Sequence, residues 1–237
     1  MNITPLIIAD HESFVALNKP SALLSIPDRL GKEPSLKDHL KKAYGEIFTV
    51  HRLDRGTSGL IIFAKTAEAH KELGSLFEGR NVEKTYNGLV LGKPAKTADS
   101  ITGPIMEHPV QKGTMVVHAK GKPAHTDYEV LENFRHYSWL RFRIHTGRTH
   151  QIRVHAKNIG HPIVCDEIYG DGKPVLLSSL KKNFNLAKKE EAERPLLARL
   201  ALHAASLQFE LYGKHYALEA PLPKDLTATL SQLRKLG

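Results

Sequence analysis

Apolar runs of strand length alternate with amphipathic segments in the first third of the chain. Two short apolar runs flank a polar Asp-His-Glu-Ser turn, a pattern that predicts a β-hairpin. Ser35, with an acid three residues later, is a helix-capping signal, and Gly45 ends that helix. Thr66 caps a second helix that has apolar residues on one face. The predicted elements are strands at residues 5–9, 14–19 and 59–65, and helices from residue 36 to about 44 and from residue 67 onwards.

The rest of the chain is interpreted as further strands joined by long loops. Residues 92–125 are rich in Gly, Pro, Lys and His, and we expect long loops with a short hairpin around residues 115–118. Loops of that length in a compact domain are usually functional. Strands mixed with helices, without regular βαβ alternation, indicate an α+β fold with a largely antiparallel sheet. The other expected elements are strands at 84–91, 126–134, 137–145, 206–212 and 215–220, and helices at 151–158 and from residue 223.

Composition narrows the class of partner. The net charge of +9 points to a polyanion, such as ribosomal RNA, tRNA, DNA or an acidic membrane surface. Cys165 is the one cysteine of the sequence, so neither an internal disulfide nor a Cys/His zinc spacing can be built, and a reducing cytoplasm is the simplest setting. The first residues lack the basic start of a signal peptide, and no apolar run approaches the roughly 20 residues of a membrane span.

Residues 51–59, His-Arg-Leu-Asp-Arg-Gly-Thr-Ser-Gly, carry the most informative chemistry. Asp54 lies between Arg52 and Arg55 on a loop that leads into a buried strand. Two neighbouring guanidiniums favour the ionised carboxylate near neutral pH, which suits a nucleophile or a charge stabiliser better than a general acid. A structural ion pair is the alternative interpretation. Ser58 has no histidine base in the motif, so we do not expect a serine nucleophile.

A basic segment follows over residues 133–165, which contain five arginines, one lysine and no acid. Its aromatic residues, among them Trp139 and Phe142, could stack on unpaired bases or face the core of a sheet. Histidines recur at five-residue intervals, at His145, His150 and His155. That spacing separates them by about 140° on a helix, unlike the i, i+4 spacing of zinc ligands, so we interpret them as structural or RNA-facing.

The motif of residues 51–59 strongly resembles the signature of the RluA-type family of RNA pseudouridine synthases. Further blocks agree in the family's order and make the resemblance highly specific over roughly residues 6–222. Ala22 and Cys165 stand where the family usually has glycine. The blocks are Asn-Lys-Pro at 18–20, Glu-Lys-Thr-Tyr at 83–86, Gly-Arg-Thr-His-Gln-Ile-Arg-Val-His at 147–155, Gly-His-Pro-Ile with a later Asp and Tyr-Gly at 160–170, and Leu-His-Ala at 202–204.

The resemblance implies the pseudouridine synthase fold, with a mixed, mainly antiparallel central sheet, flanking helices and an RNA-binding cleft. It implies one catalytic domain over residues 1–237, with a solvated, charged insertion at about 181–195. No separate RNA-binding domain is expected before the Asn-Lys-Pro block. The implied reaction converts specific uridines of tRNA or ribosomal RNA to pseudouridine, by breaking the N-glycosidic bond and rejoining the sugar at carbon 5. No metal or organic cofactor, no membrane and no obligate protein partner is implied, and we expect a cytoplasmic monomer.

The resemblance also implies roles for single residues. Asp54 would be the catalytic carboxylate, and Arg153 would pair with it and hold it ionised. Tyr86 would stack on the target base and take part in proton transfer, although a core tyrosine is the alternative. The target base must leave the RNA structure to reach a carboxylate. Arg52 would fill the gap it leaves, and Leu202 would close the floor of the pocket.

Other basic residues are candidate phosphate contacts: Arg55, Arg148, Arg143 and Lys19. A solvated charge is the alternative interpretation for each of them. Two other functions stay open at this point, a non-catalytic RNA-binding module and a metal-dependent hydrolase of DNA or nucleotides. The intact aspartate, tyrosine and arginine disfavour the module, and the lack of an acidic cluster disfavours the hydrolase. The sequence leaves open the target uridine and whether Asp54 attacks the sugar, adds to the base or acts through a glycal.

Overall fold

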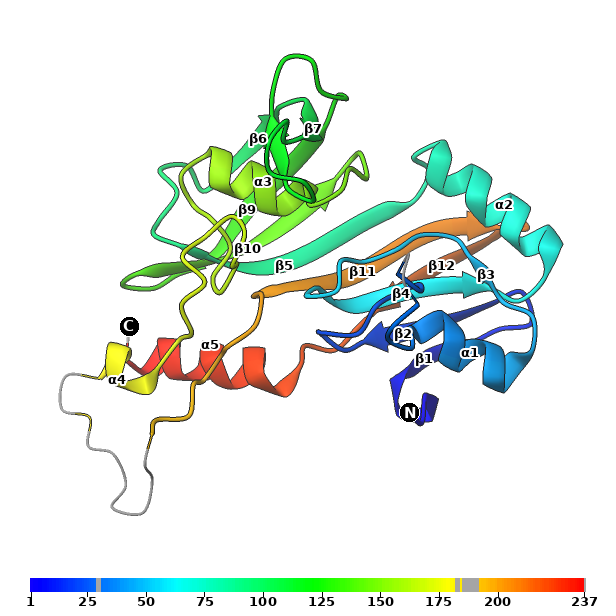
Figure 1. Cartoon of the computed structure of the whole chain (residues 1–237), viewed down its shortest axis with the longest axis horizontal. Coiled ribbons are helices and arrows are strands. Elements are labelled where there is room, and N and C mark those ends of the chain that lie inside the picture. The colour runs from blue at the N-terminus through cyan, green and yellow to red at the C-terminus, as the bar shows by residue number, and fades with distance from the viewer. Residues whose placement is uncertain (29–30, 182–183, 185–191, 237) are drawn as a thin grey trace. The chain divides into compact units, whose positions relative to one another are not determined.

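The computed structural model describes residues 1–28, 31–181, 184 and 192–236 (Figure 1). The chain divides into two units, each assembled from three separate segments. Strands β5 (Glu83–Leu91) and β10 (Tyr137–Ile144) contribute residues to both. Unit 1 comprises Met1–Tyr86, Arg143–Thr146 and His203–Pro221, and unit 2 comprises Asn87–Phe142, Gly147–Leu202 and Leu222–Gly237. The expectation of a single catalytic domain stays a prediction.

Unit 1 is built around β4, which is buried at every position. The strands are ordered β1-β2-β4-β11-β5, with β3 beside β4 and β12 beside β11. β2 pairs antiparallel with β4 from Phe14 opposite Ala64 to Lys19 opposite Gly59. β11 runs parallel to the start of β4. The strands are β1 (Ile7–Asp10), β2 (Phe14–Lys19), β3 (Phe48–Thr49), β4 (Ser58–Ala64), β11 (Leu202–Leu211) and β12 (Lys214–Glu219).

Alternate side chains of β4 enter two different apolar clusters, because successive residues of a strand point to opposite faces. Leu60 and Ile62 belong to the cluster that contains apolar residues of α2 (Ala67–Glu78). Ile61 and Phe63 belong to the cluster that contains those of α1 (Leu36–Tyr44). Both faces of β4 are therefore covered, which explains its continuous apolar sequence. The 3-10 turn η1 (Thr4–Leu6) precedes β1.

In its described residues, unit 2 combines part of the sheet with a separate hairpin and three helices (Figure 1). Its sheet strands are ordered β5-β10-β9-β6, and β7 and β8 form a two-stranded antiparallel sheet. Buried leucines and a threonine lie on one face of the C-terminal helix α5. The elements not yet named are β6 (Ala98–Thr102), β7 (Ile105–Glu107), β8 (Met115–Val117), β9 (His125–Asn133), α3 (Gln151–Asn158), α4 (Leu177–Leu180) and α5 (Lys224–Leu236).

The structure confirms an α+β fold with a mostly antiparallel sheet. Most predicted hairpin strands and capped helices lie within one or two residues of their expected positions, but β11 begins at Leu202 and not at the expected residue 206. The expected hairpin around residues 115–118 is confirmed, because β8 lies there and pairs with β7, but the prediction of long loops over the rest of residues 92–125 was wrong, because β6 and β7 lie there. β6 is short and largely exposed, so it has no apolar pattern to detect. Trp139 and Phe142 are buried core residues and do not form an exposed stacking surface. Most of the expected insertion at 181–195 lies outside the described residues.

Gly59 supplies a first prediction, because β4 and β11 approach each other there. Its φ is +114°, and an added Cβ would lie 2.6 Å from the backbone nitrogen of Ala204. We expect Gly59→Ala to lower the free energy of unfolding by roughly 3 kcal/mol or more, through overpacking and backbone strain. Gly74→Ala in α2 is the control, since its Cβ would meet nothing within 4 Å, and it should stabilise by about 0.5–1 kcal/mol. Urea unfolding of both variants measures the difference, and equal effects would contradict the close approach.

Candidate active site

The ammonium of Lys19 organises the loop that carries Asp54. Lys19 is fully buried, and its Nζ donates to the carbonyl oxygens of Pro20 at 3.0 Å, Leu23 at 2.7 Å and Arg55 at 3.3 Å. A buried charge is tolerated only when hydrogen bonds replace its hydration, and these carbonyls supply that replacement. The prediction that Lys19 contacts phosphate was wrong, because its side chain is enclosed by the protein.

Two serine hydroxyls fix the same loop on either side of Asp54. The hydroxyl of Ser25 donates to the carbonyl of Leu53 at 2.9 Å and accepts from the amide of Leu53 at 3.1 Å. The hydroxyl of Ser21 donates to the carbonyl of Gly56 at 2.7 Å. The backbone of the catalytic candidate is thus held both before and after it, and its own carbonyl accepts from the amide of residue 57 at 3.1 Å.

His51 is a neutral structural residue at the start of the motif. Its Nε2 accepts a hydrogen bond from the amide of Ile62 at 3.0 Å, and its ring stacks on Phe77 with centroids 4.5 Å apart. Burial lowers the pKa of His51 to about 3, and the nearby charge of Lys84 adds to this shift. An imidazole that accepts from a backbone amide must be unprotonated at that nitrogen. His51 therefore ties the loop to β4 and is not a proton donor at neutral pH.

Tyr86 on β5 lies close enough to Asp54 for the negative charge of the carboxylate to act on the phenol hydroxyl. Tyr86 is half-buried and packs against the apolar cluster beneath the loop. Burial raises the pKa of the Tyr86 hydroxyl, and the negative charge of Asp54 raises it further. The phenol therefore stays protonated at neutral pH and can donate a hydrogen bond, but the raised pKa makes it a weaker acid than an ordinary tyrosine. The structure brings these two predicted residues together in unit 1.

The two arginines that flank Asp54 in sequence are both exposed. The Nε of Arg55 donates to the carbonyl of Ala22 at 3.1 Å, and its guanidinium pairs with Glu33 at 2.7 Å with 55% of the side chain exposed. Arg52 is open to solvent on the same loop. Exposed guanidiniums beside a half-buried carboxylate can reach a nucleic acid phosphate or base without leaving a charge buried.

Ala22 and Cys165, which stand where the family usually has glycine, share a backbone feature. Ala22 has φ +67° and Cys165 has φ +58°, both in the left-handed region that favours glycine. Cys165 is buried, and burial raises the pKa of its thiol to about 11, so it is not a reactive thiolate. The geometry explains why the resemblance expects glycine at both positions.

Ser58 does have a histidine partner, contrary to the expectation from the motif. Its hydroxyl lies 3.0 Å from Nδ1 of His203, whose Nε2 lies 3.2 Å from the carbonyl of Ala220. Because a carbonyl can only accept, Nε2 carries the proton and Nδ1 accepts from Ser58. Both side chains are fully or almost fully buried. The pair therefore joins β4 to β11 and has no access to a substrate, so a serine nucleophile remains excluded.

In unit 2, Arg153 is held by a bidentate pair with Asp166. Its Nε and Nη2 lie 2.7 and 2.8 Å from the two carboxylate oxygens, and both side chains are buried. Burial alone would raise the pKa of Asp166, but Arg153 and the amides of Ile168 and Tyr169 outweigh it and lower the pKa. The guanidinium also lies 4.9 Å from the ring centre of Tyr169. The sequence pointed to Arg153 but did not reveal its contacts with Asp166 and Tyr169. The predicted pairing of Arg153 with Asp54 stays a prediction.

The remaining predicted residues of unit 2 are partly or fully buried. Leu202 is 3% exposed, and its Cδ1 would lie 3.3 Å from a Cβ added to Gly88. Arg148 is half-buried, and its Nε donates to the carbonyl of Pro123 at 3.1 Å. His155 is fully buried between Thr126 and the carbonyl of residue 103, which confirms the structural interpretation for this histidine.

Comparison with known proteins identifies the family. The model of the RNA pseudouridylate synthase family matches residues 13–158. The chain belongs to this family. Members are isomerases that act on RNA, so the chain is an RNA pseudouridine synthase, as its motif blocks predicted. In the described part of the chain, no helix combines the length and apolar character that crossing a membrane requires.

The similar proteins agree along almost the whole length of this pseudouridine synthase. The large-subunit pseudouridine synthase D of Pseudomonas aeruginosa is 35% identical over 97% of this chain and 72% of that protein. Its counterpart in Escherichia coli is 33% identical over 96% of this chain and 70% of that protein. Among solved structures, human RNA pseudouridylate synthase domain containing 4 matches with a TM-score of 0.77 and 26% identity, over 98% of this chain and 94% of the human one.

The buried ammonium gives a second prediction. Lys19→Met should lower the free energy of unfolding by roughly 3 kcal/mol, because it removes the buried ammonium from which partly buried carbonyl groups accept hydrogen bonds. Lys96→Met is the control, since the ion pair of Lys96 with Asp99 is exposed and its loss should leave stability unchanged. Urea unfolding provides the measurement, and a Lys19 variant as stable as the wild type would show that the carbonyls do not need the ammonium.

His51 gives a prediction about pH. The unfolded chain protonates this histidine near pH 6.5, whereas the folded protein does so only at about pH 3. The unfolded state therefore binds more protons between these values, and stability falls as the pH drops through this window, by about 1.4 kcal/mol per pH unit for this group. His51→Gln keeps an acceptor for the amide of Ile62 and should flatten the slope between pH 6 and 4, as measured by urea unfolding. His215→Gln, at an exposed site, should leave the slope intact.

Proposed function

We propose that this pseudouridine synthase modifies one or a few uridines of large-subunit ribosomal RNA. The names of the bacterial relatives, which align with nearly all of the chain, support this target over tRNA. The net charge of +9 suits a polyanionic substrate. We further propose that the protein works as a monomer in the cytoplasm. Its bacterial relatives and the buried, unreactive thiol of Cys165 support the cytoplasmic location.

Asp54 is the proposed catalytic carboxylate, and the single observation that carries this role is its setting. Its loop is anchored by hydrogen bonds on both sides, while the residue itself remains half-buried and flanked by exposed arginines. Tyr86 is proposed to stack on the target base and to take part in proton transfer from the sugar or the base, and its protonated hydroxyl can donate a hydrogen bond there. Catalytic groups held on a rigid support lose little precision when the substrate binds.

Arg153 is proposed to pair with Asp54 in the reacting complex and stabilise its charge. The bidentate contact with Asp166 and the ring of Tyr169 fix the direction of the guanidinium, which supports a role that needs orientation. The reaction breaks the N-glycosidic bond and rejoins the sugar at carbon 5 of the base. Asp54 is proposed to serve it by attacking the sugar, by adding to the base or through a glycal.

The target uridine is proposed to leave the RNA stack before it reacts, because a base inside RNA structure cannot meet a carboxylate. Arg52, exposed beside Asp54, is proposed to occupy the space that the base leaves. Leu202 is proposed to close the apolar side of the base pocket. Arg55 and Arg148 are proposed phosphate contacts, and each retains other nitrogen donors besides those bonded to Ala22 and Pro123.

Asp54→Asn tests the proposed catalytic role. Pseudouridine formation should fall at least roughly a thousandfold, since the amide cannot provide the charge or the nucleophile, while the affinity for RNA and the fold stay near normal. Pseudouridine mapping by carbodiimide and primer extension, on ribosomal RNA and tRNA from cells that lack the gene, measures product after complementation. Glu33→Gln removes an acid from the same surface and should restore the modification.

Other results would redirect the proposal. Modification that returns with Asp54→Asn would remove Asp54 from the chemistry. A site that appears in tRNA alone would replace the ribosomal target. RNA binding without any modification by the wild type would favour the non-catalytic RNA-binding module.

A further inference from the structure

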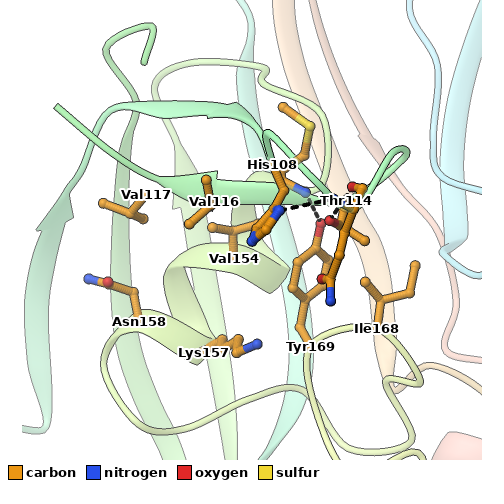
Figure 2. A pocket seen from close by; sticks show the side chains of 11 residues that line it. His108, Thr114, Val116, Val117, Val154, Lys157, Asn158, Ile168 and Tyr169 are labelled. Carbon is orange, nitrogen blue, oxygen red and sulfur yellow. Dashed lines mark hydrogen bonds between the residues drawn. The ribbon is translucent and has the colours of Figure 1, made fainter. Parts of the chain in front are cut away.

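A pocket of about 440 Å³ lies in unit 2 between the β7–β8 hairpin and α3 (Figure 2). Part of its wall is apolar: Val116 and Val117 come from β8, Val154 from α3, and Ile168 from the loop after α3. The ring of Tyr169 adds a flat aromatic surface. A volume of this size lies within the range of pockets that hold small planar ligands.

Polar side chains line the rest of the pocket. Lys157 and Asn158 come from the end of α3, and His108, Gln111 and Thr114 come from the hairpin (Figure 2). Among the described residues that line the pocket, none is a carboxylate, and Lys157 brings a positive charge. The polar part of the pocket therefore offers an ammonium, two amides and a hydroxyl beside an apolar floor, and it favours an anionic ligand.

The hydrogen bonds of the pocket are arranged before any ligand enters. The hydroxyl of Tyr169 accepts from the amide of Met115 at 2.7 Å, so its own proton is directed to Nδ1 of His150 at 2.8 Å. Nδ1 of His108 accepts from the amides of Val110 and Gln111 at 3.2 and 3.0 Å. The proton of a neutral His108 therefore resides on Nε2, which makes that nitrogen a donor. The hydroxyl of Tyr169 is therefore hydrogen-bonded within the protein, while its ring remains part of the pocket wall.

We propose that this pocket binds an unpaired nucleotide of the RNA substrate, apart from the uridine that is isomerised. This inference rests on the proposed function. An unpaired base offers two flat faces and a polar edge, and proteins recognise such bases by stacking and edge hydrogen bonds. The apolar floor and the Tyr169 ring take the face, the amides of Gln111 and Asn158 meet the edge, and Lys157 meets the phosphate.

Such a site would help to select the target. A base can enter only where the RNA is single-stranded or bulged, so the pocket would favour an unpaired nucleotide at a set distance from the reacting uridine. The pocket also shares Tyr169 with the support of Arg153, whose guanidinium lies 4.9 Å from the ring centre. Tyr169 is therefore unsuited to a test, since its loss would disturb Arg153 as well.

Ile168→Glu tests the site with little risk to the fold, because Ile168 is 44% exposed. The new carboxylate would repel the phosphate and replace an apolar contact with the base by a charge. The Kd for a large-subunit ribosomal RNA transcript should therefore rise about tenfold. The single-turnover rate at saturating RNA should stay near that of the wild type. Leu131→Glu is the matched control, since Leu131 is 37% exposed on β9 in the same unit, does not line the pocket and makes the same charge change. Unchanged affinity in Ile168→Glu, or equal losses in both variants, would overturn the inference.

A second measurement does not depend on the RNA target. Methyl NMR of the full chain, titrated with uridine 5′-monophosphate, should shift the signals of Val116, Val117, Val154 and Ile168, while ribose 5-phosphate should not. Equal shifts with both ligands would show an anion site without base recognition, and no shift at these methyls would overturn the proposal. If the wild type modified no ribosomal RNA, the proposed function would fail, and this titration would still decide on the pocket.

Discussion

The buried ammonium of Lys19 is the contact on which the arrangement around Asp54 depends. It joins the end of β2 to the loop before β4 through carbonyl groups of both segments. A neutral side chain could fill the space, but it could not satisfy several converging carbonyls. The loop can then leave Asp54 half-buried while its backbone is held by Ser21 and Ser25. A basic residue that looked suited to RNA binding thus contributes to the site by shaping it from within.

The two units treat their functional carboxylates differently. Asp54 lies on a loop and remains partly exposed, as the catalytic role proposed for it requires. Asp166 is buried, and its two carboxylate oxygens accept hydrogen bonds from the guanidinium of Arg153 and from backbone amides. A buried ion pair of this kind contributes less to stability than to a defined geometry. Here it orients an arginine whose chemical use depends on direction.

Tyr86 and Tyr169 also differ in the surroundings of their hydroxyl groups. Tyr86 packs against the core of unit 1 and keeps its proton through burial and the charge of Asp54. Tyr169 has its hydroxyl fixed by the β7–β8 hairpin and by His150, so its ring acts as a rigid surface for Arg153 and for the pocket. Burial thus keeps the Tyr86 hydroxyl protonated beside a carboxylate, whereas the Tyr169 hydroxyl holds its ring in place.

Much of the fold could be predicted from the sequence, which also supplied the candidate site residues. Capping residues such as Ser35 and the continuous apolar run of β4 act locally, so their signals lie within a few residues of one another. The ordered motif blocks likewise pointed to Asp54, Tyr86 and Arg153 before any geometry was known. β6 escaped detection because an exposed, short strand takes its hydrogen bonds from β9 and has no buried face.

The supporting contacts were decided only by the tertiary structure. Ser58 meets His203 across 145 positions of sequence, and Arg153 meets Asp166 after the chain has turned at the end of α3. Burial made Lys19 a structural cation rather than a phosphate ligand. Sequence determines which groups are present and the local elements that carry them. Packing determines which of those groups lose their water, and a group that has lost its water must bind whatever polar partner the fold has placed beside it.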